Sequence, residues 1–137
     1  MVLWRYGKQV SWMLMTIGYM VFIWLQSEYF NPQLIEIYAY RLDFPILVIL
    51  GTVFELLHLI EFGILFIFLI CTFKANPNGE FTKKKMIVCF ILSLLYSLID
   101  EIHQLYVPYR SFSFVDIFKN FIGIFIVYYI VKKRYKW

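Results

Sequence analysis

The chain has 137 residues, of which 62% are hydrophobic and 22% aromatic, with a formal net charge of +4 and a mean hydropathy of +0.72. A soluble domain of this size could not bury so much apolar surface, so lipid is the expected solvent. The basic residues gather beside apolar segments and form no stripe with exposed aromatics, which argues against nucleic-acid binding.

Four apolar runs predict an all-α, polytopic membrane protein with four transmembrane helices in a single domain over residues 1–137. The predicted spans are about 10–26, 46–73, 86–107 and 114–131. Each is near the ~20 residues that cross a hydrocarbon core of about 30 Å at a rise of 1.5 Å per residue.

The first run follows Arg5 and Lys8, as the apolar part of a signal peptide would. The residues after it, 27–30, read SEYF and contain no small-x-small cleavage motif. We therefore expect a retained membrane anchor.

The second run contains Glu55, His58 and Glu61 at three-residue steps. Side chains at this spacing are spread over roughly 120° around the helix axis, so they lie on one side of the helix. Ionisable groups within a span are costly and usually face a protein interior or an aqueous cavity. We expect these three side chains to do so.

The third run ends with Asp100, Glu101, His103 and Gln104. Its uncharged part is too short to cross a membrane, so these residues must continue the helix. Three of them share a face by their i, i+3, i+4 spacing, and Glu101 points about 100° away. Pro108 is expected to end the helix.

The fourth run begins with Ser113-x-x-Asp116, which matches a capping box before an apolar segment. Asp116, Asn120 and Gly123 follow at i, i+4, i+7 and form one polar, small stripe. A short hairpin between the third and fourth helices puts Asp100 about 10 Å deep and Asn120 about 9 Å deep. We therefore expect these two side chains to meet, with His103 turned toward Asp116.

Lysine and arginine predict the orientation, because they favour the cytoplasmic side of short loops. Few basic residues lie on one side, namely Arg41, Arg110 and Lys119. Most lie at the two termini and in the loop 74–85. Both termini are therefore predicted to be cytoplasmic, with the hairpin around Pro108 outside.

The acids outnumber the bases in the last three predicted spans and in the hairpin around Pro108. Arg110 and Lys119 stand against Glu55, Glu61, Asp100, Glu101 and Asp116. Protonation of acids or histidines, or a bound cation, must compensate the excess negative charge. The cluster is consistent with a network that locks helices together, with a catalytic or ligand site, or with a metal site. It has no diagnostic zinc spacing, and the sequence assigns neither a metal nor a cofactor.

The motifs DEIHQ at 100–104 and VPYRS at 107–111, followed by Asp116, Asn120 and Gly123, resemble the signature of the VanZ-like family of bacterial membrane proteins. The segment HLIEFG at 58–63 resembles the family's other motif. The resemblance covers essentially the whole chain. The sequence departs from the family pattern at Glu55, Leu59, Phe62 and Tyr109, where a basic residue, Phe, Tyr and Gly are usual.

The resemblance implies a multi-pass protein of the bacterial cytoplasmic membrane, linked to resistance to the glycopeptide teicoplanin. In one hypothesis the protein is an enzyme acting on an anionic lipid or cell-wall precursor at the outer leaflet, with Asp100 and His103 as an acid–base pair. The candidate catalytic residues are Asp100, Glu101, His103, His58 and Glu61. The candidate substrate-binding residues are Arg110, Gln104, Ser111, Asp116, Asn120 and Glu55.

A second hypothesis is a non-catalytic protein that binds a lipid or antibiotic within the membrane, or a scaffold. A third is an ion or proton path, which four spans could form only as an oligomer. The sequence leaves the enzymatic activity and the oligomeric state open.

Overall fold

A computed structural model of the protein describes residues 2–29 and 44–135, and these residues form long helices joined by short loops. The all-α prediction is confirmed. The helices are α1 (Val2–Tyr29), α3 (Phe44–Lys74), α4 (Lys83–Gln104) and α5 (Phe114–Arg134).

Three of these helices are long and apolar enough to cross a membrane, which makes the chain a multi-pass membrane protein. The qualifying segments are Tyr6–Tyr29, Lys83–Gln104 and Phe114–Arg134. The α3 helix has 31 residues, enough for about 46 Å at 1.5 Å per residue. That α3 is a fourth span stays a prediction.

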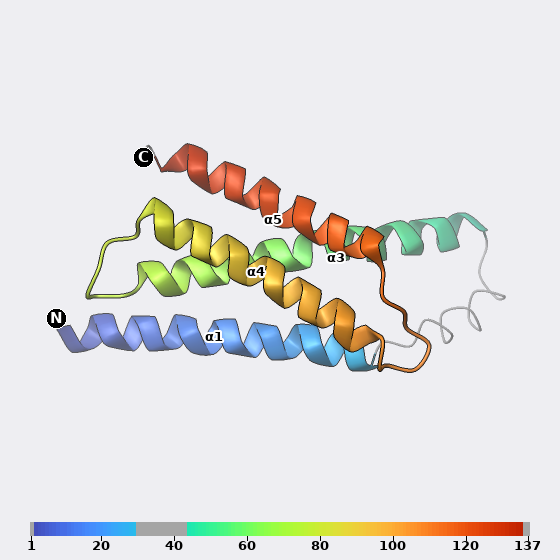
Figure 1. The fold of residues 1–137 in the computed structure, drawn as a ribbon, viewed down its shortest axis with the longest axis horizontal. Helices are drawn as coiled ribbons and strands as arrows, with labels where there is room; N and C mark the ends of the chain where they lie inside the picture. The colour runs from blue at the N-terminus through green and yellow to red at the C-terminus, as the bar shows by residue number, and fades with distance from the viewer. Residues whose placement is uncertain (1, 30–43, 136–137) are drawn as a thin grey trace.

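Both chain ends lie at the same end of the bundle as the loop 75–82 between α3 and α4 (Figure 1). We call this the terminal end. The opposite, distal end holds the last turn of α1, the last turn of α4 and the loop 105–113 (Figure 1). The cytoplasmic position of the terminal end stays a prediction.

The α3 helix contacts all three other helices, and its contact with α5 is the most extensive. Phe62, Leu65 and Phe66 of α3 are fully buried in the apolar core. At Gly123 of α5, a Cβ atom would lie 1.7 Å from the carbonyl oxygen of Leu59. The two backbones are therefore in direct contact where they cross.

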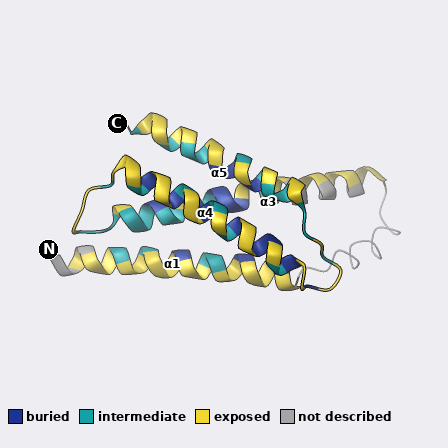
Figure 2. Ribbon diagram, in the orientation of Figure 1, coloured by how far each residue is buried: buried dark blue, intermediate teal, exposed yellow. Residues whose placement is uncertain are grey.

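The exterior of the bundle is apolar, and part of its interior is polar. Figure 2 shows exposed residues along the outward faces of the helices, and many of these are Ile, Leu, Val and Phe. The buried residues include Glu61, Asp100, Glu101 and Asn120. Lipid is the solvent that makes such a distribution favourable.

The hairpin between α4 and α5 is fixed by local hydrogen bonds. The α4 helix ends at Gln104, before the end of the predicted span, and residues 105–107 follow in tight turns. Pro108 explains the early end, because the residue before a proline is disfavoured in helical geometry. The predicted cap is confirmed: the Ser113 hydroxyl accepts a hydrogen bond from the Asp116 backbone N–H at 3.2 Å.

Candidate functional site

The last turn of α4 directs three polar side chains into the bundle at the distal end. Asp100, Glu101 and Gln104 are 1%, 0% and 3% exposed. The sequence predicted that the acids continue the helix, and α4 includes them. Burial of two adjacent carboxyl groups is costly, so their hydrogen-bond partners decide what the site can do.

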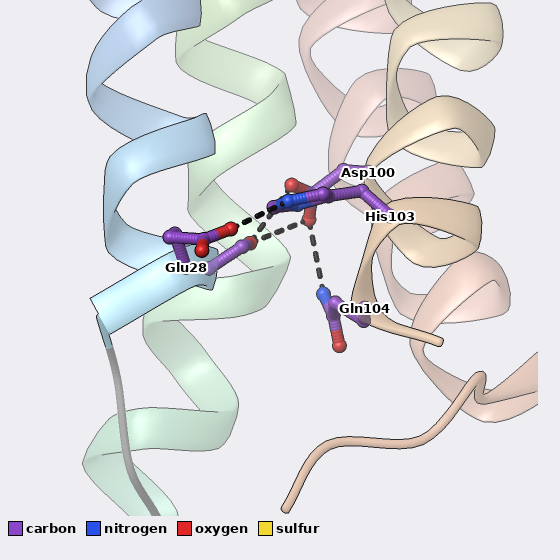
Figure 3. Close-up of polar contacts among 5 residues, drawn as sticks. Glu28, Asp100, His103 and Gln104 are labelled. Carbon is purple, nitrogen blue, oxygen red and sulfur yellow. Dashed lines mark hydrogen bonds and ion pairs between the residues drawn. The ribbon is translucent and has the colours of Figure 1, made fainter. Parts of the chain in front are cut away.

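Asp100 is held by neutral donors. The Ser27 hydroxyl of α1 lies 2.8 and 2.9 Å from its two carboxylate oxygens, and the Gln104 side-chain amide donates at 3.0 Å (Figure 3). We expected Asp100 to meet Asn120 of α5. That expectation is wrong, because the Asp100 carboxylate turns toward α1.

Glu101 extends the same chain of hydrogen bonds toward α5. Gln104 Nε2 lies 3.4 Å from one Glu101 oxygen, and the Ser113 backbone N–H donates to the other at 3.1 Å. A continuous path therefore runs from Ser27 through Asp100, Gln104 and Glu101 to Ser113. It ties α1, α4 and the start of α5 together.

His103 also faces α1 and not Asp116, contrary to the sequence-based expectation. Its Nε2 lies 2.8 Å from a Glu28 carboxylate oxygen (Figure 3). The imidazole stacks on the Trp24 ring, with centroids 3.7 Å apart and planes inclined by 21°. Asp116 instead pairs with Lys119, whose Nζ is 2.9 Å from a carboxylate oxygen.

Arg110 brings a permanent positive charge to the cluster from the loop 105–113. Its guanidinium interacts electrostatically with Glu61 of α3 and with Glu101 of α4. Glu61 and Asp100 also interact electrostatically. The charge of Arg110 therefore interacts with acids of both α3 and α4.

Asn120 is fully buried, and neither atom of its side-chain amide has a hydrogen-bond partner. It lies on α5, one turn before the Gly123 crossing with α3. The great majority of buried amides are paired with protein groups or ordered water. Asn120 therefore offers a free donor and a free acceptor inside the bundle.

A comparison with protein families matches residues 4–135 to VanZ/LLP1. The chain belongs to the VanZ/LLP1 family. No curated protein and no solved structure matches it. The family match covers all but the first two residues of the described helices. It includes the polar residues at the distal end, which we call the distal cluster: Ser27, Glu28, Glu61, Asp100, Glu101, His103, Gln104, Arg110 and Asn120.

Three other predicted site residues of this VanZ/LLP1 protein are not seen to contact the distal cluster. Either their side chains are not described or they are exposed. Glu55 and His58 belong to α3, but their side chains are outside the described residues. Ser111 is exposed in the loop 105–113. Among the described residues, no group of three His, Cys, Asp or Glu side chains gathers closely enough to hold a metal ion.

The contribution of α1 to this candidate site was not predicted from the sequence. Trp24, Ser27 and Glu28 all contact the last turn of α4. Their i, i+3, i+4 spacing puts them on one face of α1, and this was the available signal. The spacing alone could not show that this face meets the acids of α4.

Proposed function

We propose that this VanZ/LLP1 protein binds the anionic polar group of an envelope lipid or lipid-linked cell-wall precursor inside the distal end of its bundle. The observation that carries the proposal is the unpaired, fully buried amide of Asn120. An unsatisfied buried polar group costs about 1–3 kcal/mol, and a ligand with phosphate and hydroxyl oxygens would remove that cost.

Arg110 supports an anionic ligand. A guanidinium carries five N–H donors in a planar fork and binds phosphate or carboxylate through two parallel hydrogen bonds. Arg110 enters from the loop 105–113, at the end where a lipid headgroup would lie if the bundle spans the membrane. The nearby carboxylate of Glu61 would accept hydrogen bonds from ligand hydroxyl or amide groups.

The contacts favour binding over catalysis. The Asp100 carboxylate already accepts from Ser27 and Gln104, and the ring of His103 is held by Glu28 and Trp24. An acid–base pair made of Asp100 and His103 would have to leave these contacts before touching a substrate. Catalysis is the alternative, and Asp100→Asn separates the two: binding tolerates the substitution, whereas acid–base chemistry does not.

The resemblance to VanZ-like proteins adds an expectation in the cell. A protein of the bacterial cytoplasmic membrane that holds a cell-wall precursor would lower the susceptibility of its host to teicoplanin. The teicoplanin concentration that stops growth should rise when the chain is expressed, and Arg110→Gln should abolish this rise at unchanged protein abundance.

Direct binding tests the proposal most simply, with polyprenyl phosphate as the probe and native mass spectrometry of the detergent-solubilised protein as the measurement. Asn120→Leu replaces the buried amide with an apolar group of similar size. We expect about a tenfold loss of polyprenyl phosphate binding with no loss of thermal stability, since a buried unpaired amide is removed.

Gln26→Leu, an exposed position of α1 near the same end, is the matched control and should leave binding unchanged. If Asn120→Leu binds polyprenyl phosphate as well as the parent protein does, the proposal is wrong.

A further inference from the structure

A hollow lies at the terminal end, far from the distal cluster. It has a volume of about 660 Å³ and is formed by the start of α1, the end of α3 and the loop 75–82. The side chains and backbone that shape it belong to Trp4, Lys8, Lys74, Asn76, Gly79 and Glu80. Sites for small ligands commonly occupy about 300–1,000 Å³, so the hollow is large enough for a headgroup.

The hollow is positively charged. Lys8 of α1 and Lys74 of α3 line it from two helices that are distant in the sequence. The Lys85 ammonium lies at the rim of the hollow, where it donates a hydrogen bond to the Glu80 backbone carbonyl at 2.7 Å. It also packs against Gly79: a Cβ built on that glycine would be 2.9 Å from the Lys85 nitrogen. Three lysines therefore lie in or at the rim of the hollow, and its lining contains one acidic residue, Glu80.

The position of the hollow indicates a ligand that belongs to the membrane. The segment of α1 that qualifies as a span begins at Tyr6, and that of α4 begins at Lys83, so the hollow lies at the boundary of the apolar region. Trp4 lines it and is 74% exposed, as is typical of tryptophan at a membrane interface. The Lys8 ammonium lies 6.0 Å from the centroid of that ring.

We propose that this hollow binds the phosphate of an anionic phospholipid headgroup between Lys8 and Lys74, with Trp4 against the glycerol and upper acyl chain. Basic pockets between transmembrane helices bind anionic headgroups in this way, because the ammonium groups attract the phosphate at a level that the lipid already occupies. The site is independent of the function proposed for the distal end.

The test uses the full chain in nanodiscs of phosphatidylcholine with a minor fraction of brominated phosphatidylglycerol, and it measures quenching of tryptophan fluorescence. In the double variant Lys8→Gln/Lys74→Gln, the preference for phosphatidylglycerol over phosphatidylcholine should fall about tenfold. The matched control is Lys132→Gln/Lys133→Gln, which removes the same charge from α5 without touching the hollow. It should keep the preference.

Glu80→Gln provides the opposite change, because it removes the one acid of the hollow and should raise the preference. An equal loss in the two double variants would mean that only diffuse surface charge attracts the lipid, and the proposal would be overturned. Unchanged preference in Lys8→Gln/Lys74→Gln and in Glu80→Gln would overturn it as well. Displacement of the lipid by soluble glycerol phosphate would show that the hollow takes free phosphate esters, which contradicts a lipid site.

Discussion

The side-chain amide of Gln104 donates to two carboxylates at once, at 3.0 Å to Asp100 and 3.4 Å to Glu101. The other donors to these acids, the Ser27 hydroxyl and the Ser113 N–H, are also neutral. Neutral donors satisfy the lone pairs of a carboxylate but do not cancel its charge. The guanidinium of Arg110 therefore has an electrostatic role that none of these donors can fill.

Ser27→Ala tests whether the α1 contact stabilises the bundle. The substitution removes the hydroxyl donor from both oxygens of a buried carboxylate, which should cost about 1–3 kcal/mol. We expect a lower midpoint of thermal unfolding in detergent for Ser27→Ala. Ser11→Ala, at an exposed position of the same helix, should leave the midpoint unchanged. Equal midpoints for the two variants would contradict the account of the Asp100 contact.

Tyr109 has a φ of 65°, in the left-handed region that favours glycine. The VanZ-like pattern usually has Gly at this position, and the backbone geometry explains why. Tyr109→Gly should raise the free energy of unfolding by up to about 1 kcal/mol, since the left-handed conformation is costly for residues with a Cβ.

The control for this prediction is Tyr106→Gly in the same loop. Tyr106 is 82% exposed and Tyr109 is 61% exposed, so neither substitution removes a large buried contact, and only Tyr109 has a positive φ. Denaturant titration of both variants should show a gain for Tyr109→Gly alone. A loss of stability in Tyr109→Gly would show that its side chain matters more than its backbone.

At the scale of elements, the crossing of α3 and α5 depends on two glycines. A Cβ at Gly123 would lie 1.7 Å from the Leu59 carbonyl oxygen, and one at Gly63 would lie 3.2 Å from the Gly123 carbonyl oxygen. Small residues at such crossings let helices approach closely within lipid. The close approach keeps Asn120, one turn away on α5, inside the bundle.

Gly123→Ala should separate α3 from α5 and destabilise the protein by about 1–3 kcal/mol, the usual cost of inserting atoms into a packed core. Gly18→Ala on α1 is the matched control, because nothing lies within 4 Å of a Cβ built there. Alanine favours a helix more than glycine does, so the control should be neutral or slightly stabilising. Similar unfolding midpoints for the two variants would show that the crossing tolerates a methyl group.

The sequence predicted the elements better than their contacts. Local patterns of hydropathy and hydrogen bonding were enough to predict the helix order, the Ser113 cap and the inclusion of Asp100 to Gln104 in α4. The pairing of Ser27 and Glu28 with α4 depends on how two helices rotate against each other, which spacing within one helix does not determine. For the same reason, the expected contact of Asp100 with Asn120 was wrong.

At the scale of the whole molecule, apolar side chains face outward, while Asp100, Glu101, Gln104 and Asn120 are buried inside the bundle. The two termini lie at the opposite end, which carries most of the lysines and arginines. This arrangement is consistent with an even number of spans and a cytoplasmic terminal end, as the distribution of basic residues predicts.

Labelling of single cysteines in intact cells tests this topology. In a background with Cys71 and Cys89 replaced by serine, Ser111→Cys in the distal loop should react with an impermeant maleimide added outside. Glu80→Cys in the loop 75–82 should react only after the membrane is opened. Reaction of Glu80→Cys in intact cells would reverse the predicted orientation.

A high-resolution structure of the protein with bound polyprenyl phosphate is the most direct test of the central claim, that the distal end of the bundle holds an anionic polar group. We expect density for the phosphate within hydrogen-bond distance of the Arg110 guanidinium and of the Asn120 amide. Density for the phosphate elsewhere, with both side chains unchanged and Asn120 still unpaired, would contradict it.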